Sequence, residues 1–205
     1  MSGIAILPPH EDGFVRKKWS VEECRFLTEN GLLLPGKYEL IEGEIVFKMG
    51  QGRLHIAVVT RIVAALAAIF GAEALQNQAQ IGIGERDEFN DPEPDVAVLK
   101  GRVTDYIECE PDPASEVLLA IEASNTTLQG DITTKARLYA RHGIPEYWVV
   151  AISRRTLIVH RGPTAEGYAD VKVYDEKASV APLAAPASRV HVADLLIDAA
   201  SGDSM

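Results

Sequence analysis

Apolar residues recur with a helical period in three stretches of the chain, and each stretch predicts a helix. The first covers residues 19–31, where Ser20 is the expected N-cap of a capping box. The second covers residues 55–71 and is long and strongly apolar, as suits a buried amphipathic helix. The third covers residues 131–143, with Asp131 as its expected N-cap and a glycine beyond its end.

Runs of apolar residues that suit β-strands lie between and after these helices. "KYELIEGEIVFKM", residues 37–49, predicts a β-hairpin that turns at Glu42 and Gly43 and puts Glu39 and Glu44 on one face. Further strands are expected at five places: residues 79–83, 95–99, 116–123, 145–152 and 156–161. Two smaller elements, a hairpin arm and a short helix, are expected at residues 168–175 and 192–200. The pattern predicts an α/β domain with a mixed central sheet, an N-terminal helix and a β-hairpin.

The composition of the 205 residues, 47% hydrophobic and 24% charged, is that of a globular protein with one sizeable core. Residues 1–17 have no apolar period and are expected to be a flexible arm, followed by a single domain over residues 18–205. No signal peptide is apparent at the N-terminus. Thr60 and Arg61 interrupt the longest apolar run. We therefore expect no membrane partner, because a span needs about 18 apolar residues.

The net charge of −10 and the sequence pI near 5.0 count against generic binding of nucleic acid, which favours a basic face. They leave room for a local basic groove, or for acidic side chains that gather around a cation. The two cysteines, Cys24 and Cys109, lack metal-ligand spacing. We expect them to be reduced thiols of a cytoplasmic protein.

Acidic residues stand at positions of the predicted strands that should be buried. Asp95 begins the strand "DVAVL", Glu122 ends the run "VLLAIE", and Glu39 lies on the hairpin with Glu44 on the same face. If the strands of Asp95 and Glu122 are neighbours, their carboxylates converge at one end of the sheet. Carboxylates that converge repel one another unless a cation lies between them, and oxygen ligands favour Mg²⁺ or Mn²⁺.

Lys135 is expected in the first turn of the helix that follows Glu122, beside the end of that strand. Helical spacing places it next to Leu138 and Tyr139 on the apolar stripe, where a lysine costs stability. Lys135→Met is therefore expected to keep or raise the melting temperature. Each residue also has a simpler interpretation: a turn residue for Asp95, a solvated strand end for Glu122, and a surface lysine for Lys135. The order of the three along the chain favours a shared site.

Three sequence segments that contain these residues, in this order, resemble those of a known family. "EPDVAVL", "VLLAIEASNTT" and "DITTKARLYARHGIPEYWVV" are similar to the Uma-two family of endonucleases, which belongs to the PD-(D/E)XK, restriction-endonuclease-like superfamily. "YELIEGEIV" and a histidine, His55, at the start of the next helix also match its pattern. The resemblance covers roughly residues 19–150. The strings "YELIEGE" and "GIPEYW" are its most specific parts.

The resemblance implies a restriction-endonuclease-like α/β/α core and hydrolysis of phosphodiester bonds with a divalent metal. It assigns Asp95 to the PD element, Glu122 to the acidic position, and Lys135 to a lysine that has moved from the strand to the following helix. Many relatives have a Ser-Pro-Ser-like turn after the glutamate, where this chain has "SNTT", residues 124–127.

The resulting hypothesis is an endonuclease that uses Mg²⁺ or Mn²⁺ on nucleic acid, with DNA favoured as substrate. Asp95 and Glu122 are the expected metal ligands, with a carbonyl near Ala123 and Glu39 or Glu44 nearby. Lys135 is expected to orient or deprotonate the attacking water or to stabilise charge in the transition state, and we favour charge stabilisation. His55 is expected to be structural or to support a ligand rather than to bind metal. A homodimer is expected, because two sites suit the cutting of two strands.

Two other classes of function remain open at this point. One is a non-catalytic interaction module that keeps the nuclease fold, and the acidic net charge favours it. The other is a metal-dependent hydrolase of small phosphate esters, which would need an enclosed pocket rather than a groove. Metal binding separates the first alternative from a nuclease, and the shape of the site separates the second.

Overall fold

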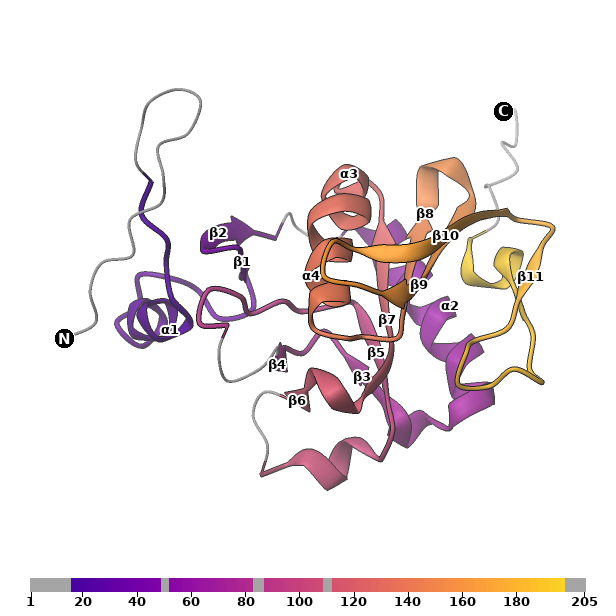
Figure 1. Ribbon diagram of the computed structural model, residues 1–205, viewed down its shortest axis with the longest axis horizontal. Coiled ribbons are helices and arrows are strands. Elements are labelled where there is room, and N and C mark those ends of the chain that lie inside the picture. Colours follow the sequence, from indigo (N-terminus) through magenta and orange to yellow (C-terminus); the bar gives the residue numbers. More distant parts are fainter. Residues whose placement is uncertain (1–15, 49–51, 83–86, 109–111, 198–205) are drawn as a thin grey trace.

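A six-stranded mixed sheet forms the centre of the computed structural model, which describes residues 16–48, 52–82, 87–108 and 112–197 (Figure 1). The strand order is β10-β9-β8-β7-β5-β3, and only the pair of β7 and β8 is parallel. These strands are β3 (Leu75–Asn77), β5 (Val96–Leu99), β7 (Val117–Ser124), β8 (Glu146–Ala151), β9 (Thr156–Pro163) and β10 (Tyr168–Asp175). The predicted α/β class with a mixed central sheet is confirmed.

Six short strands pair two by two beside this sheet. They are β1 (Tyr38–Ile41) with β2 (Glu44–Phe47), β4 (Ile81–Gly82) with β6 (Asp112–Pro113), and β11 (Ser179–Val180) with β12 (Val190–His191). The β1–β2 hairpin has the predicted register, with Glu39 opposite Val46. The strand predicted at residues 79–83 is only partly present, since β4 pairs with β6 and β3 takes the edge of the central sheet.

The helices are α1 (Val21–Glu29), α2 (Arg53–Phe70), α3 (Leu128–Gly130), a π-helical turn (Asp131–Lys135) and α4 (Ala136–Arg141). Short 3₁₀ turns occur at Ala72–Ala74, Val103–Tyr106, Ala114–Glu116, Ile152–Arg154 and Val192–Leu195. The capping box predicted for α1 is present. Ser20 Oγ accepts from the backbone N–H of Glu23 at 3.1 Å, and the Glu23 carboxylate accepts from the N–H of Ser20 at 3.0 Å.

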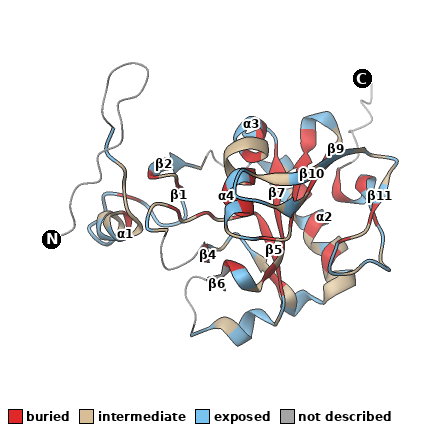
Figure 2. Cartoon of the chain, viewed as in Figure 1, coloured by how far each residue is buried: buried red, intermediate tan, exposed pale blue. Residues whose placement is uncertain are grey.

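Helices cover both faces of the central sheet, which makes a layered α/β/α core. On one face, α2 contributes Val58 and Ile62 to a buried cluster that includes Ile121 of β7. On the other face, Tyr139 of α4 packs in a cluster that includes Ala120 of β7. Successive side chains of a strand point to opposite faces, which explains why β7 is apolar at every position from Val117 to Ile121. Figure 2 shows the buried residues concentrated on the central strands.

Helix α2 has 18 residues and a mean hydropathy of 1.8, so by length and composition alone it is long and apolar enough to cross a membrane. Thr60 and Arg61 therefore do not remove this stretch from the candidates for a membrane span. Its fully buried residues, Val58, Ile62 and Leu66, pack in the core cluster against the sheet. Only 17% of the helix is buried, so one stripe packs on the sheet. The absence of a membrane partner stays a prediction.

The crossover from β7 to β8 differs from its prediction at its start. The helix begins at Leu128, three residues before Asp131, so the prediction that Asp131 caps the helix is wrong. Asp131 is instead buried inside the helical run, where its Oδ2 accepts a hydrogen bond of 2.6 Å from Thr127 Oγ1. Lys135 ends the π-helical turn and does not lie in the first turn of the helix. A π-helical turn in a helix is uncommon and often marks a functional site.

Several predictions fall partly or wholly outside the described residues. Most of the predicted arm, residues 1–15, lies there, and the single domain over residues 18–205 stays a prediction. Cys109 also lies outside them, whereas Cys24 is buried, and burial raises the pKa of its thiol to about 11. Of the helix predicted at residues 192–200, the described part forms one 3₁₀ turn.

Candidate active site

Strands β5 and β7 are neighbours, so the two carboxylates that they carry meet at one end of the sheet. Val96 pairs with Ile121 in the antiparallel ladder. Continuing that register by one residue places Asp95 opposite Glu122, and residues directly opposite each other point to the same face. Asp95 Oδ2 also accepts a hydrogen bond of 2.8 Å from the backbone N–H of Ala123. The two strand ends therefore lie together, as the sequence predicted.

Lys135 reaches this strand end from the π-helical turn. Its Nζ lies 2.7 Å from Glu122 Oε1 and 2.8 Å from Glu39 Oε2. The side chain of Lys135 is only 14% exposed, and those of Glu39 and Glu122 are 9% and 7% exposed. The lysine thus joins the hairpin, the central sheet and the crossover helix. We call Glu39, Asp95, Glu122 and Lys135 the carboxylate–lysine cluster.

Two further side chains hold the carboxylates of the cluster in place. His55, near the start of α2, places Nε2 3.0 Å from Asp95 Oδ1. Tyr139, fully buried in α4, donates its hydroxyl to Glu122 Oε1 at 3.4 Å. The position of His55 suits a residue that orients a carboxylate. The sequence placed Tyr139 on the apolar stripe of the helix, but its hydroxyl contact depends on how α4 packs on β7.

A second lysine near the cluster was not anticipated. Lys48 directly follows β2, and its Nζ forms an ion pair with Glu93 and lies 3.9 Å from Glu39 Oε1. Local sequence carries no signal for this contact, because Lys48 and Glu93 belong to segments far apart in the chain. Glu44, by contrast, is exposed on β2 and forms no ion pair with the described residues of the cluster. Of Glu39 and Glu44, Glu39 is the one that the fold brings into the site.

The cluster carries more negative than positive charge. Burial raises the pKa of Glu122 well above its usual value, and the charges of Asp95 and Glu39 add to this effect against the opposing charge of Lys135. Burial likewise raises the pKa of Glu39. Burial alone would lower the pKa of Lys135, but the carboxylates of Glu122 and Glu39 outweigh it and raise that pKa. Lys135 therefore stays protonated, and the cluster favours a further cation.

Asp95 is the carboxylate of the cluster that is most readily ionised. Burial raises its pKa, but the hydrogen bonds from His55 and from the Ala123 N–H outweigh burial, and the net pKa is lowered. The hydrogen bond to Asp95 raises the pKa of His55 in turn. Asp95 is therefore favoured as a carboxylate, and the imidazole of His55 beside it takes up a proton more readily than a free histidine.

The donor atoms of the cluster fit a hard divalent cation. Asp95 and Glu122 offer carboxylate oxygens on the same face, and Glu122 Oε2 accepts no hydrogen bond from the described residues. Oxygen donors of this kind suit Mg²⁺ and Mn²⁺. Within the described ranges, no group of three or more His, Cys, Asp and Glu side chains is arranged to hold a metal ion. Two carboxylates leave the remaining positions to water and substrate, which is how Mg²⁺ is usually bound.

The family model described as "Putative restriction endonuclease" (Uma2) matches residues 31–193 of the chain. The chain belongs to the Uma2 family. The match includes the whole carboxylate–lysine cluster, and it confirms the family that the motifs indicated. Helix α1 lies before the matched residues. No curated protein matches the chain.

A solved structure similar to this Uma2 protein is titled "Crystal structure of a putative nuclease belonging to DUF820 from Anabaena variabilis ATCC 29413". The two chains are 19% identical, with a TM-score of 0.58, and the similarity covers 77% of this chain and 88% of the other. At this identity the likeness concerns the fold. The restriction-endonuclease-like fold class predicted from the sequence is confirmed, and family and fold together support a nuclease.

Proposed function

We propose that the chain is a divalent-metal-dependent endonuclease that hydrolyses phosphodiester bonds of nucleic acid, with DNA as the favoured substrate. One observation carries the proposal: Lys135 Nζ lies 2.7 Å from Glu122 at the strand end that Asp95 shares. Packing of the core alone does not require a lysine and three carboxylates at one strand end, whereas metal-dependent phosphodiester hydrolysis uses both kinds of group. Membership of the Uma2 family supports the same chemistry.

Asp95 and Glu122 would hold the ion, with Mg²⁺ or Mn²⁺ as the ions that carboxylate oxygens favour. Such an ion, when bound, lowers the pKa of water and polarises a phosphoryl oxygen. His55 keeps Asp95 ionised and oriented through its hydrogen bond at 3.0 Å. Support of this kind around a ligating carboxylate strengthens metal binding.

Lys135 would stabilise the negative charge that builds on the phosphoryl group, rather than remove a proton from water. A lysine acts as a base only when its pKa is depressed, and the neighbouring carboxylates raise the pKa of Lys135. Glu39 Oε2 also contacts the ammonium group, at 2.8 Å. We assign Glu39 the role of a positioning residue for Lys135. A homodimer, with one site for each strand of a duplex, is part of the proposal.

Cleavage of DNA and RNA in Mg²⁺ or Mn²⁺, measured with and without EDTA, tests this function. We expect metal-dependent cleavage by the wild type and a loss of at least about 100-fold in Asp95→Asn and Glu122→Gln. Asp170→Asn changes a carboxylate of β10 that pairs with Lys172 outside the cluster, and it should cleave like the wild type. Cleavage that survives EDTA, or that Asp95→Asn and Glu122→Gln retain in full, would contradict the proposal. A folded protein that cleaves neither substrate would favour the interaction module.

A further inference from the structure

A cavity of about 390 Å³ lies beside the carboxylate–lysine cluster and shares no residue with it. Its walls come from α1, from the segment that leads into β1, and from the residues around β4 and before β5. Its size falls within the range of about 300–1,000 Å³ that is typical of small-molecule sites. Nothing in the proposed chemistry uses this cavity, so its lining needs an explanation of its own.

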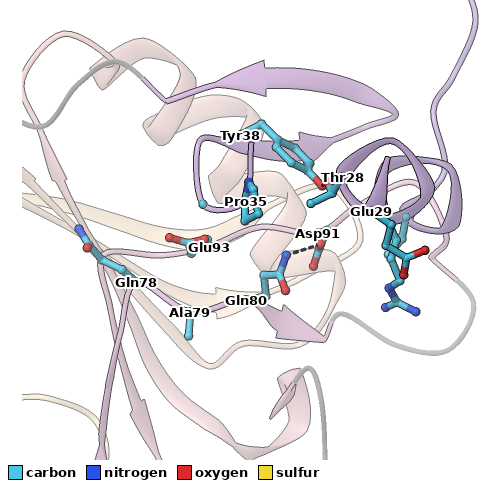
Figure 3. A pocket seen from close by; sticks show the side chains of 12 residues that line it. Thr28, Glu29, Pro35, Tyr38, Gln78, Ala79, Gln80, Asp91 and Glu93 are labelled. Carbon is cyan, nitrogen blue, oxygen red and sulfur yellow. Dashed lines mark hydrogen bonds between the residues drawn. The ribbon is translucent and has the colours of Figure 1, made fainter. Parts of the chain in front are cut away.

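One side of the cavity offers a rigid aromatic and apolar surface. The hydroxyl of Tyr38 is held by Thr28 Oγ1 at 2.8 Å and by the carbonyl of Cys24 at 3.4 Å, which fixes the ring. Pro35 lines the cavity near Tyr38 (Figure 3). A fixed aromatic ring beside a proline suits the flat face of a heterocycle, because every nucleobase has a π-face that stacks on such a surface.

The polar lining offers hydrogen-bond acceptors and a cation. Gln80 Nε2 donates to Asp91 Oδ2 at 2.6 Å, and this bond orients the carboxylate (Figure 3). Asp91 Oδ1 accepts no hydrogen bond from the described residues and can receive a donor from a ligand. Burial raises the pKa of Asp91 to about 6, and the charge of Arg25 opposes that rise. At neutral pH the carboxyl is therefore mostly ionised, and Arg25 is close enough to influence it.

The cavity is joined to the cluster by a short chain of contacts. Glu93 lines the cavity and pairs with Lys48, and Lys48 lies 3.9 Å from Glu39 of the cluster. If the phosphate of a nucleotide lies at the cluster, the base of that nucleotide or of the adjacent nucleotide would therefore lie near the cavity. The lining carries Glu29, Asp91 and Glu93 against Arg25, so it favours an occupant that donates hydrogen bonds to carboxylates. The aromatic and apolar side favours a flat organic ring.

We propose that this cavity binds one unpaired nucleobase of the substrate strand and that guanine fits it best. The adjacent N1–H and 2-amino groups of guanine are donors for Asp91 and for the Gln80 carbonyl oxygen, and its O6 is an acceptor for Arg25. Bases taken out of the stack are read in this manner, by stacking and by hydrogen bonds on the Watson–Crick edge. The inference rests on the proposed function, because it takes nucleic acid as the substrate.

Binding of labelled single-stranded 12-mers, measured by fluorescence anisotropy with Ca²⁺ in place of Mg²⁺, tests the inference. The three probes are all-thymine, the same strand with one central guanine, and the same strand with inosine, which lacks the 2-amino group. We expect the guanine strand to bind wild type about tenfold more tightly than the thymine strand, which is about 1.4 kcal/mol. The inosine strand should fall between them.

Asp91→Asn and Gln80→Leu should each reduce the preference for guanine to less than twofold. Gln129→Leu changes an exposed glutamine of α3 outside the cavity and should keep the preference. Equal binding of the three strands by wild type, no measurable binding of any strand, or a full preference in folded Asp91→Asn would overturn the inference. Cleavage without a guanine preference would refute the inference alone, and a preference without cleavage would refute the proposed function alone.

Discussion

Lys135 is the residue on which both the fold and the proposed chemistry depend. The sequence placed it on an apolar stripe and indicated that Lys135→Met would keep or raise the melting temperature. The structure changes this expectation, because Nζ contacts the buried carboxylates of Glu39 and Glu122 at 2.8 and 2.7 Å. Removing the cation leaves two carboxylates without their partner, and breaking one member of a buried ion pair is costly.

We therefore predict that Lys135→Met lowers the free energy of unfolding by roughly 3 kcal/mol at pH 7. The loss should be smaller at pH 5, because Glu39 and Glu122 have raised pKa values and take up protons more readily in the absence of the lysine. Urea unfolding at the two pH values measures both effects. Lys172→Met removes an exposed lysine that pairs with Asp170 and should change stability by less than about 0.5 kcal/mol. An unchanged unfolding midpoint in Lys135→Met would contradict the ion pairs.

His55 allows a separate test of how the metal ligands are supported. Because Nε2 of His55 bonds Asp95 at 3.0 Å, His55→Ala should weaken Mn²⁺ binding by about 10–100-fold without abolishing it. Calorimetric titration with Mn²⁺ measures the change. The control is His191→Ala, which alters an exposed histidine of β12. Complete loss of binding would make His55 a direct ligand, and unchanged affinity would make it purely structural.

Asp91 should make stability depend on pH. Burial raises its pKa from an ordinary 3.8 to about 6, so the folded chain holds this proton more tightly than the unfolded chain does. The resulting stabilisation is fully present at low pH and is lost as pH rises through the interval between these two values. Relative to Asp91→Asn, the wild type should lose about 1–3 kcal/mol across that interval. Unfolding curves of the two proteins that stay parallel from pH 4 to pH 7 would refute the assignment.

Among the elements, those with a clear local pattern could be predicted, whereas the pairing of short strands with distant partners could not. The capping box of α1 and the turn of the β1–β2 hairpin are set by residues adjacent in sequence, and both are present. Of the strand predicted at residues 79–83, the structure has Ile81–Gly82, and its pairing with the distant strand β6 has no local signal. Asp131 looked like an N-cap, but the helix extends past it through a π-helical turn, which has no sequence signature.

The same limit applies to the residues of the candidate site. Asp95 and Glu122 could be identified because a carboxylate on an apolar strand is conspicuous. Lys135 could be identified because a lysine on an apolar stripe is equally out of place. The roles of Lys48 and of the Tyr139 hydroxyl could not be predicted. Lys48 contacts Glu93 and Tyr139 contacts Glu122 only because separate elements pack together.

A buried ion pair between β8 and β9, outside the carboxylate–lysine cluster, tests whether stability can be lowered without changing the cleavage rate. Glu146 of β8 is fully buried, with Arg161 of β9 donating to its Oε1 at 2.6 Å and the backbone N–H of Leu183 to its Oε2 at 2.7 Å. Arg161→Met should lower the free energy of unfolding by about 3–5 kcal/mol, because it leaves this carboxylate buried without a counterion.

At a temperature where both proteins are folded, Arg161→Met should cleave nucleic acid at the wild-type rate, as measured by single-turnover kinetics. Arg154→Met, which alters an exposed arginine after β8, is the matched control and should change neither quantity. A cleavage rate that falls tenfold in folded Arg161→Met would show that this ion pair serves the active site as well.

On the scale of the whole molecule, the net charge of −10 opposes binding of another polyanion. If the carboxylate–lysine cluster takes up a divalent cation, part of that opposition is removed at the place where the phosphate must lie. Anisotropy with a 12-nucleotide strand should therefore report at least tenfold tighter binding in Ca²⁺ than in EDTA at equal ionic strength. The gain should be lost in Glu122→Gln and kept in Asp170→Asn. Equal affinity with and without Ca²⁺ would contradict a metal at the cluster.

The single-turnover cleavage rate of Lys135→Met tests the central claim most directly. The comparison is with wild type and Lys172→Met, in Mg²⁺ or Mn²⁺, at a temperature where all three are fully folded. If Lys135 meets charge that develops only during phosphodiester cleavage, kcat and kcat/KM should fall together by at least about 100-fold, with Mn²⁺ affinity unchanged or higher. Lys172→Met should match wild type. Cleavage by Lys135→Met at the wild-type rate would contradict the account.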